Sequence, residues 1–313
     1  MKPVIEVKDL TKRYPQSKSN AVDCISFDVH QGEFFALLGP NGAGKTTTIS
    51  VLTTTLIATS GTVRVCGYDV DTDPSGVRRN SGIIFQNRSL DENLTAEENI
   101  RLHAILYGMY GFRPTFGTMP TAYKHKVEEL ASVLGIEAEI HNPINTFSGG
   151  MKRKLEIIRG LIHSPKVLFL DEPTTGLDPE SRRNLWEYLS DAQERNGVTV
   201  FLTTHYLEEV NSADKICIID RGKIVSLGSP DEVKSDLAGA YLIVDCNERS
   251  SLIEELDSLG VNYEVNRKIK IQVNPNEVHK ILRNIETPLS NVETQDATLE
   301  DAYLKIIGED SWN

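Results

Sequence analysis

A glycine-rich stretch after a short apolar run constrains the fold of this 313-residue chain more than any other feature. Residues 39–46 read GPNGAGKT and fit the pattern G-x-x-x-x-G-K-[ST], and the run EFFALL precedes them. Glycines let the backbone curl so that successive N–H groups point inward at phosphate oxygens. A helix that starts at Gly44 would add the positive end of its dipole. The sequence therefore predicts a phosphate-binding loop between a buried strand and a helix.

Functional side chains are predicted on both sides of the phosphates. Lys45 supplies a point charge for the terminal phosphates, and Thr46 supplies a hydroxyl for Mg²⁺. The apolar run VLFL carries Asp171 to the carboxyl edge of the sheet, where ligands of parallel α/β sheets bind. Asp171 is expected to hold the Mg²⁺ shell, which leaves Glu172 to polarise a water molecule. The residues predicted to bind nucleotide in the loop are Gly39, Pro40, Asn41, Gly42, Ala43, Gly44, Lys45, Thr46 and Thr47.

Residues 1–230 alternate between apolar runs and helical patterns, which predicts an α/β domain with a mostly parallel sheet. Runs that are apolar along their full length suit strands covered on both faces. Residues 46–57 read TTTISVLTTTLI and are predicted as a helix because they follow the phosphate loop, although nine of the twelve are β-branched. The expected strands are Phe34–Leu38, Val167–Leu170 and Val198–Thr203, and the expected helices include Lys124–Leu134 and Pro179–Arg195.

A second, smaller domain is predicted over residues 239–313. Its order of strand, helix, strand, strand, helix, strand fits a small α+β unit of the ferredoxin-like type. A last helix is expected over Thr298–Ile307, with Thr298 as its N-cap and Asp301 three residues later. The predicted strands are Tyr241–Asp245, Asn262–Val265, Lys268–Val273 and Asn291–Thr294, and the predicted helices are Asp231–Leu237, Ser250–Leu259 and Pro275–Ile285.

Composition excludes several other classes of protein. A net charge of −12 disfavours non-specific binding to nucleic acid as the main activity. The four cysteines are too sparse for a disulfide framework and lack metal-ligand spacing, which indicates reduced thiols in a cytosolic protein. The N-terminus MKPVIEVKDL is not a signal peptide, and without an apolar run of 18 residues the chain is not expected to span a membrane.

Further motifs resemble those of the ATP-binding subunits of ABC transporters. FSGGM at residues 147–151 looks like the signature motif of that family, and EPTTGLDP contains its D-loop up to Asp178. Gln86 in GIIFQ matches the glutamine of the Q-loop, His205 in VFLTTH the switch histidine, and Tyr14 in KRY the aromatic residue that stacks on adenine. The resemblance implies a P-loop NTPase fold over residues 1–230, with a helical subdomain over about residues 87–160. It assigns ATP and Mg²⁺ to the site, with catalytic roles for Glu172 and His205 and an additional metal contact for Gln86.

The same resemblance explains a second anion site in one chain. In this family two ATP-binding domains pack head to tail, and each ATP lies between the phosphate loop of one and the signature of the other. Ser148, Gly149 and Gly150 would form the second cradle at a helix N-terminus. One chain carries one copy of each motif, so two identical chains would form two sites by twofold symmetry. Met151 replaces the common Gln and loses a polar contact to the nucleotide, and residues 152–154 are expected to be a solvated helix face.

The stretches LDENLTAEENIRLHAILYG and TLEDAYLKIIG resemble the daunorubicin-resistance and sodium-export ATPases of the ABC-2 exporter group. The resemblance implies an ATPase on the cytoplasmic face of the cell membrane that powers export through a separate transmembrane subunit. The transported compound is expected to be drug-like, a lipid or otherwise hydrophobic. Two alternatives are an ABC ATPase acting on nucleic acid or ribosomes and a regulatory module without turnover. The acidic charge and the absence of long insertions disfavour the first, and Glu172 with His205 disfavours the second.

Overall fold

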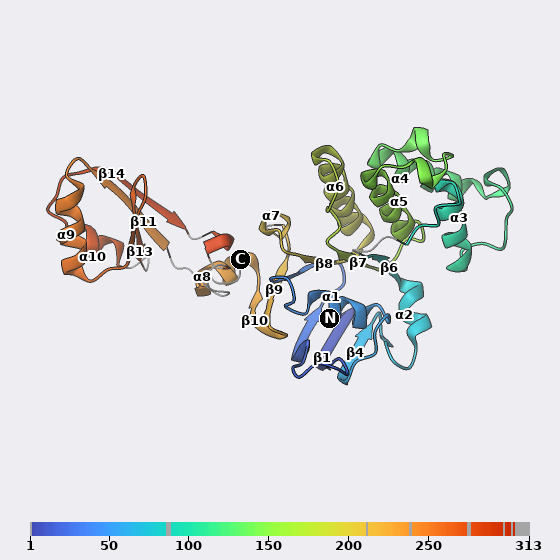
Figure 1. The fold of residues 1–313 in the computed structure, drawn as a ribbon, viewed down its shortest axis with the longest axis horizontal. Helices are drawn as coiled ribbons and strands as arrows, with labels where there is room; N and C mark the ends of the chain where they lie inside the picture. Colours follow the sequence, from blue (N-terminus) through green and yellow to red (C-terminus); the bar gives the residue numbers. More distant parts are fainter. Residues whose placement is uncertain are drawn as a thin grey trace. The chain divides into compact units, whose positions relative to one another are not determined.

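The computed structural model describes residues 2–85, 89–210, 212–237, 240–273, 277–296, 298–301 and 303. The chain divides into two compact units, Met1–Ser226 and Leu227–Asn313. The elements of each unit can be followed in Figure 1. No helix among the described residues combines the length and the apolar character needed to cross a membrane.

A six-stranded sheet forms the centre of the first unit. Its strand order is β10-β9-β3-β8-β7-β6, and the pairs β9–β3, β3–β8, β8–β7 and β7–β6 are parallel. Every residue of β3, β7 and β8 is buried, as expected for strands covered on both faces. The predicted parallel sheet is thus confirmed. Its strands are β3 (Phe34–Leu38), β6 (Ser81–Ile84), β7 (Val167–Asp171), β8 (Thr199–Thr204), β9 (Lys215–Asp220) and β10 (Lys223–Gly228).

A second sheet of the first unit is antiparallel and is absent from the sequence prediction. Its order is β2-β1-β4-β5, with β1 (Ile5–Lys12), β2 (Val22–Val29), β4 (Ser60–Val65) and β5 (Tyr68–Asp69). Burial in β2 alternates along much of the strand, because only one of its faces packs on the core. Strands of this kind give no continuous apolar run, so the signal that predicts buried strands does not reveal them.

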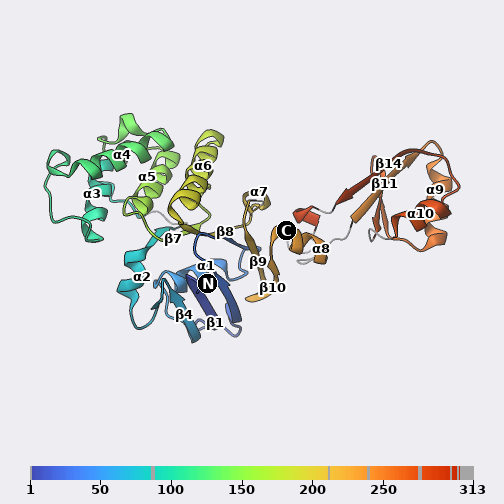
Figure 2. The same cartoon turned by 180° about the vertical axis from the view of Figure 1, so that it is seen from behind.

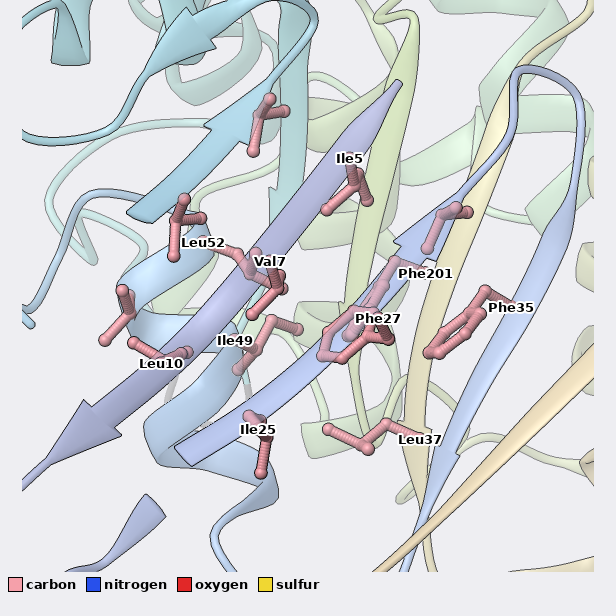
Figure 3. Packing of buried hydrophobic residues seen from close by; sticks show 14 of the residues in the cluster. Ile5, Val7, Leu10, Ile25, Phe27, Phe35, Leu37, Ile49, Leu52 and Phe201 are labelled. Atoms are coloured by element: carbon pink, nitrogen blue, oxygen red, sulfur yellow. The ribbon is translucent and has the colours of Figure 1, made fainter. Parts of the chain in front are cut away.

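The core of the first unit lies between this antiparallel sheet, the parallel sheet and helix α1 (Lys45–Leu52). Figure 3 shows Phe27 of β2, Phe35 of β3 and Phe201 of β8 side by side, with the ring centroids of Phe27 and Phe35 5.1 Å apart. Ile49 and Leu52 bring α1 into the same cluster. The phosphate loop is therefore anchored on both sides, by β3 before it and by α1 after it.

Helix α1 is shorter than predicted, because it ends at Leu52 rather than at Ile57. Its β-branched residues are accommodated by hydroxyls that donate to carbonyls four residues earlier, as Thr48 Oγ1 does to the Gly44 oxygen (2.9 Å) and Thr53 Oγ1 to that of Ile49 (2.8 Å). Thr54 adopts a left-handed conformation with φ of 62°, which is incompatible with continuing the helix.

Helices α3, α4 and α5 pack together in one layer, in which α5 contacts both α3 and α4. Figures 1 and 2 show these three helices grouped together from opposite sides, with α6 beside them. All three lie within the stretch predicted as a helical subdomain, and α4 and α6 match two predicted helices closely. The helices of this unit besides α1 are α2 (Pro74–Asn80), α3 (Ala96–Leu106), α4 (Thr121–Leu134), α5 (Gly149–Leu161), α6 (Pro179–Asn196) and α7 (Leu207–Val210). Short 3-10 turns occupy Phe116–Thr118, Glu137–Glu139 and Ile144–Thr146.

The second unit contains a four-stranded sheet in the order β12-β13-β11-β14, with every neighbouring pair antiparallel. Leu252 and Leu256 of α9 and Ile281 of α10 pack on the buried side chains of β11 and β13, so this unit has its own core. Its elements are α8 (Pro230–Leu237), β11 (Ala240–Cys246), α9 (Arg249–Leu259), β12 (Tyr263–Val265), β13 (Ile269–Val273), α10 (Val278–Asn284) and β14 (Leu289–Asp296).

The predicted last helix begins as expected. Thr298 Oγ1 accepts from the backbone N–H of Asp301 (3.1 Å), and Asp301 Oδ2 accepts from the backbone N–H of Thr298 (2.9 Å). This reciprocal pair is a capping box. The predicted continuation to Ile307 lies outside the described residues.

Candidate nucleotide-binding site

The phosphate loop spans the six residues between Leu38, where β3 ends, and Lys45, where α1 begins. Gly44 has φ of 111°, and a Cβ there would lie 2.6 Å from the Ala21 carbonyl oxygen. A Cβ on Gly39 would lie 2.3 Å from the Ile219 oxygen, whereas a Cβ on Gly42 would meet nothing within 4 Å. The loop is thus tightly packed at Gly39 and Gly44 and open at Gly42, which fits a cradle that receives a ligand on its open side.

The Lys45 side chain lies inside this cradle, and the residue is only 5% exposed. Its Nζ donates to the carbonyl oxygens of Gly39 (2.6 Å) and Pro40 (3.0 Å). Burial lowers the pKa of Lys45, while the carboxylates of Glu172 and Asp171 oppose that change. An ammonium group held in this way is stabilised by an added anion, as the predicted role with phosphates requires.

Asp171 and Glu172 lie at the carboxyl end of β7, beside the end of β8. Asp171 is 2% exposed, and its Oδ1 accepts from the hydroxyl of Thr203. Burial raises the pKa of Asp171, and the hydrogen bond from Thr203 and the charge of Lys45 oppose that rise. A bound cation would stabilise this buried carboxylate further.

Glu172 and His205 meet directly, with 3.0 Å between Glu172 Oε1 and His205 Nδ1. Glu172 has φ of 48°, a left-handed conformation that non-glycine residues rarely adopt and that is concentrated at functional sites. Its N–H donates to the Thr203 oxygen (3.0 Å), which fixes this turn against β8. The Glu172 side chain is 11% exposed and that of His205 33%, so the pair is reachable from solvent.

The residues present fit a magnesium ion that is held jointly with a nucleotide. Thr46 is exposed in the first turn of α1, and Asp171 offers one buried carboxylate. Among the described residues, no group of three His, Cys, Asp or Glu side chains could hold a metal alone. Mg²⁺ typically takes one or two protein ligands and completes its shell with phosphates and water. Gln86, predicted as a further ligand, lies outside the described residues.

Tyr14 lies beside the phosphate loop, as a base-stacking residue should. Its hydroxyl is 3.3 Å from Thr47 Oγ1, and Lys12 Nζ is 5.6 Å from the centre of its ring. The residue is 42% exposed, so the ring has surface available for a base. The stacking on adenine that the resemblance implies for Tyr14 stays a prediction.

The signature residues lie at the start of a different helix. Ser148 is the N-cap of α5 and accepts from the N–H of Met151 (3.2 Å), and both Ser148 and Gly149 are exposed. Within the described part of the chain, no hydrogen bond or ion pair joins Ser148, Gly149 or Gly150 to the phosphate loop. The exposed start of α5 thus presents backbone N–H groups, as the predicted anion cradle requires, and the binding of an anion there stays a prediction.

Asp178 lies at the start of α6 as its N-cap. Its carboxylate accepts from the Ser181 N–H (2.8 Å) and hydroxyl (2.7 Å), and Lys154 Nζ lies 3.3 Å away. The hydrogen bonds from Ser181, together with Lys154, lower the pKa of Asp178. These contacts account for Asp178 within one chain, and the nucleotide contact predicted for it stays a prediction.

The prediction that residues 152–154 form a solvated helix face is wrong. Lys152 pairs with Glu92 (2.5 Å), and Lys154 with Asp178. Arg153 is 3% exposed and donates to the carbonyl oxygens of Asp171 (3.1 Å), Glu172 (2.8 Å), Pro173 (3.0 Å) and Phe85.

Arg153 therefore ties the signature helix to the backbone of the acidic pair. A guanidinium group can be buried where several carbonyl groups accept its five N–H donors. The sequence does not reveal this role, because Arg153 lies between two lysines. A signal in the sequence is the apolar residues Leu155, Ile157 and Ile158, which follow Arg153 along α5 and are buried.

The fold and this site together define a P-loop nucleotide-binding ATPase. Residues 22–175 match the family model described as ABC transporter, and residues 140–211 also match an AAA domain model. The chain is 35% identical over 259 residues to the doxorubicin resistance ATP-binding protein DrrA of Mycobacterium tuberculosis. The aligned region covers 82% of this chain and 75% of DrrA. It is 32% identical to the linearmycin resistance ATP-binding protein LnrL of Bacillus subtilis, over 97% of this chain and 98% of the relative. The chain belongs to the ABC transporter family of ATP-binding proteins, close to its drug-resistance members.

Other comparisons agree with this assignment. The chain is 37% identical to the probable multidrug ABC transporter ATP-binding protein YbhF of Escherichia coli, over 75% of this chain. That match spans only 39% of YbhF. A solved ATP-binding subunit of an ABC transporter superposes with a TM-score of 0.67 at 30% identity, covering 74% of this chain and 92% of that one. A dimeric ATP-binding cassette with bound ADP and Pi superposes with a TM-score of 0.65 at 25% identity. The superposition covers 72% of this chain and 98% of that one.

Proposed function

We propose that the chain is the Mg²⁺-dependent ATP-hydrolysing subunit of an exporter and powers transport through a separate transmembrane subunit. The contact between Glu172 and His205 beside the phosphate loop carries this proposal. A module that only binds nucleotide needs Lys45 and the glycines, whereas a carboxylate paired with a histidine is needed for turnover. The names of the relatives, which refer to drug or antibiotic resistance and multidrug transport, support a drug-like compound as the exported substrate.

In this proposal each residue has a part in hydrolysis, which the distances described above support. Lys45 and the loop N–H groups bind the terminal phosphates, and Tyr14 stacks on the base. Thr46 and Asp171 would hold Mg²⁺, which would supply positive charge against the phosphates. Glu172 orients the attacking water and accepts its proton. Because His205 Nδ1 contacts Glu172, its Nε2 is the nitrogen left to face the γ-phosphate.

Two copies of the chain complete two sites. Each chain has one phosphate loop and one signature, and its Ser148 and Gly149 are exposed. A similar cassette is a dimer with bound ADP and Pi, which supports dimerisation of this chain. In a twofold dimer, the cradle of Ser148, Gly149 and Gly150 would grip the γ-phosphate held by Lys45 of the other copy.

An apolar patch in the helical layer supports docking of the membrane subunit there. Leu102 and Leu106 of α3 are 44% and 75% exposed, and Phe112 in the following loop is 79% exposed. Leu102 and Leu106 are four residues apart and therefore lie on one face of α3, and exposed apolar faces are typical of interaction sites. Docking at this patch would hold the chain at the membrane, and we propose the cytoplasmic face for this site.

Leu106→Glu is expected to abolish docking and to leave ATP binding intact, because it adds a charge to the patch and lies outside the nucleotide site. The matched control is Ile57→Glu, since Ile57 is 74% exposed and lies outside the helical layer. The tagged variants would be purified from solubilised native membranes. A multi-span protein that copurifies with the wild type and with Ile57→Glu, and is lost with Leu106→Glu, supports the proposal. The proposal is refuted if no multi-span protein copurifies with the wild type, or if the same amount is recovered with the wild type and both variants.

We also propose that the second unit is a ferredoxin-like domain over about residues 239–313 that is not required for the chemistry. Its strand order and antiparallel pairing are those of a ferredoxin-like sheet. It has its own core, and all predicted nucleotide residues precede it in the chain.

A chain truncated after Gly228 is therefore expected to bind ATP with an affinity within about threefold of that of the full chain. Such a change corresponds to less than about 1 kcal/mol. Titration with a fluorescent ATP analogue measures it, and circular dichroism confirms that the shortened chain is folded. A folded truncation that no longer binds nucleotide would contradict the proposal.

A further inference from the structure

Glu209, on the short helix α7 after β8, is buried at 8% exposure, although no site was predicted there. Both of its carboxylate oxygens accept hydrogen bonds from hydroxyl groups. Thr204 Oγ1 donates to Oε2 at 2.6 Å, and Thr174 Oγ1 donates to Oε1. The two threonines are themselves buried, at 0% and 1% exposure. The carboxylate thus bridges two segments that are separate in the sequence.

These two segments carry the catalytic pair. Thr174 lies two residues after Glu172, and Thr204 directly precedes His205. Thr204 Oγ1 also accepts from the N–H of Tyr206 (2.9 Å), which fixes the backbone on the far side of the histidine. Glu209 is therefore joined through one hydroxyl to the turn of Glu172 and through the other to the turn of His205.

Burying this carboxylate is costly for the fold. Among the described residues no Lys, Arg or His forms a salt bridge with Glu209. Its carboxylate is therefore stabilised by two neutral hydroxyl donors in place of solvating water. A buried charge without a cationic partner is destabilising compared with an apolar side chain of similar size. The arrangement does, however, specify one relative position for the two segments, because both hydroxyls must point at the same carboxylate.

We propose that Glu209 is a positioning residue for ATP hydrolysis, which holds Glu172 and His205 in register by binding Thr174 and Thr204. This proposal rests on the ATPase function proposed above. Glu209 acts on the water-activating pair and has no part in the phosphate loop, so its loss should lower kcat and spare ATP binding. Displacing a catalytic group by about 1 Å can cost about 100-fold in rate.

The experiment compares Glu209→Ala and Glu209→Gln with Glu208→Ala, which removes an exposed carboxylate from the same helix. For Glu209→Ala, kcat is expected to fall about 10- to 100-fold, while KM for ATP stays within about threefold. Glu209→Gln retains one carbonyl oxygen, and its amide can donate to a threonine hydroxyl, so much of the rate should be rescued. Glu208→Ala should match the wild type.

A double-mutant cycle separates positioning from a general structural effect. Because Glu209 acts through His205, His205→Ala should lower kcat much less in the Glu209→Ala background than in the wild type. Thr174→Val removes the hydroxyl that donates to Glu209 and changes the shape of the side chain little. It serves as the test if a thermal melt shows that Glu209→Ala is not folded. Its kcat should fall in the same way.

Wild-type kcat in a folded Glu209→Ala, or fully additive losses in the cycle, would overturn the role of Glu209 and leave the ATPase function standing. If Glu209→Ala does not fold, an unchanged kcat in Thr174→Val would have the same meaning. A wild-type chain that binds ATP and never hydrolyses it, even with its membrane partner, would instead overturn the proposed function and with it the role of Glu209.

Discussion

Replacing Glu172 with glutamine is expected to lower kcat for ATP hydrolysis at least about 100-fold, because a positioned general base contributes roughly 10²- to 10⁴-fold. Glutamine keeps the size of the side chain and its Oε1 position opposite His205 Nδ1, which lies 3.0 Å away in the wild type. It removes the negative charge that accepts the proton of the attacking water. ATP binding should persist, because Lys45 and the loop glycines are untouched.

Two other variants define what this result means. Lys45→Ala removes the buried ammonium and should weaken ATP binding itself, which separates loss of the ligand from loss of chemistry. Glu208→Gln makes the same chemical change at an exposed position and should leave kcat unaltered. Phosphate release and nucleotide titration on the same preparations measure both quantities. A Glu172→Gln chain that turns over ATP at the wild-type rate would show that another group activates the water.

The sequence was sufficient to predict the parallel sheet and the phosphate loop, for a physical reason. A loop that wraps phosphates needs glycines at fixed spacing, and strands buried on both faces need unbroken apolar runs such as Phe34–Leu38. Both requirements are local, so they are visible in a short window of sequence. The antiparallel sheet was missed because β1 and β2 each pack on one face only, and their pattern resembles that of a surface segment.

The contacts that hold the catalytic pair could not be predicted from the sequence. Arg153 binds carbonyl groups 18 and 19 residues away, and Glu209 binds a hydroxyl 35 residues away. Charged residues are usually solvated, so the sequence predicts a surface position for residues 152–154. The hydrogen bonds from Arg153 of α5 to the end of β7, and between Glu209 of α7 and the end of β8, show that these charges are buried and satisfied. The reacting groups were thus visible in the motifs, whereas the groups that place them depend on tertiary structure.

In the Glu172→Gln background, ATP is expected to drive formation of a dimer. Adding Gly149→Asp is expected to weaken this association at least about 100-fold. With hydrolysis blocked, the γ-phosphate stays in place and the cradle of the second chain can hold it. Gly149 is the first residue of α5 and is exposed, so aspartate there would set a carboxylate against the γ-phosphate across the interface. Juxtaposed like charges at an interface cost several kcal/mol, which corresponds to this loss of affinity.

The same substitution should not harm the fold, because a negative charge in the first turn of a helix is favourable to the helix dipole. Gly111→Asp is the matched control, since Gly111 is exposed and a Cβ there would meet nothing within 4 Å. Sedimentation at several protein concentrations, with ATP and without it, measures the dimer. The dimer should form with ATP in Glu172→Gln and in its Gly111→Asp derivative, and fail to form in its Gly149→Asp derivative. An equally stable ATP-dependent dimer with Gly149→Asp would show that the start of α5 does not face the nucleotide of the partner, and the head-to-tail arrangement would have to be abandoned.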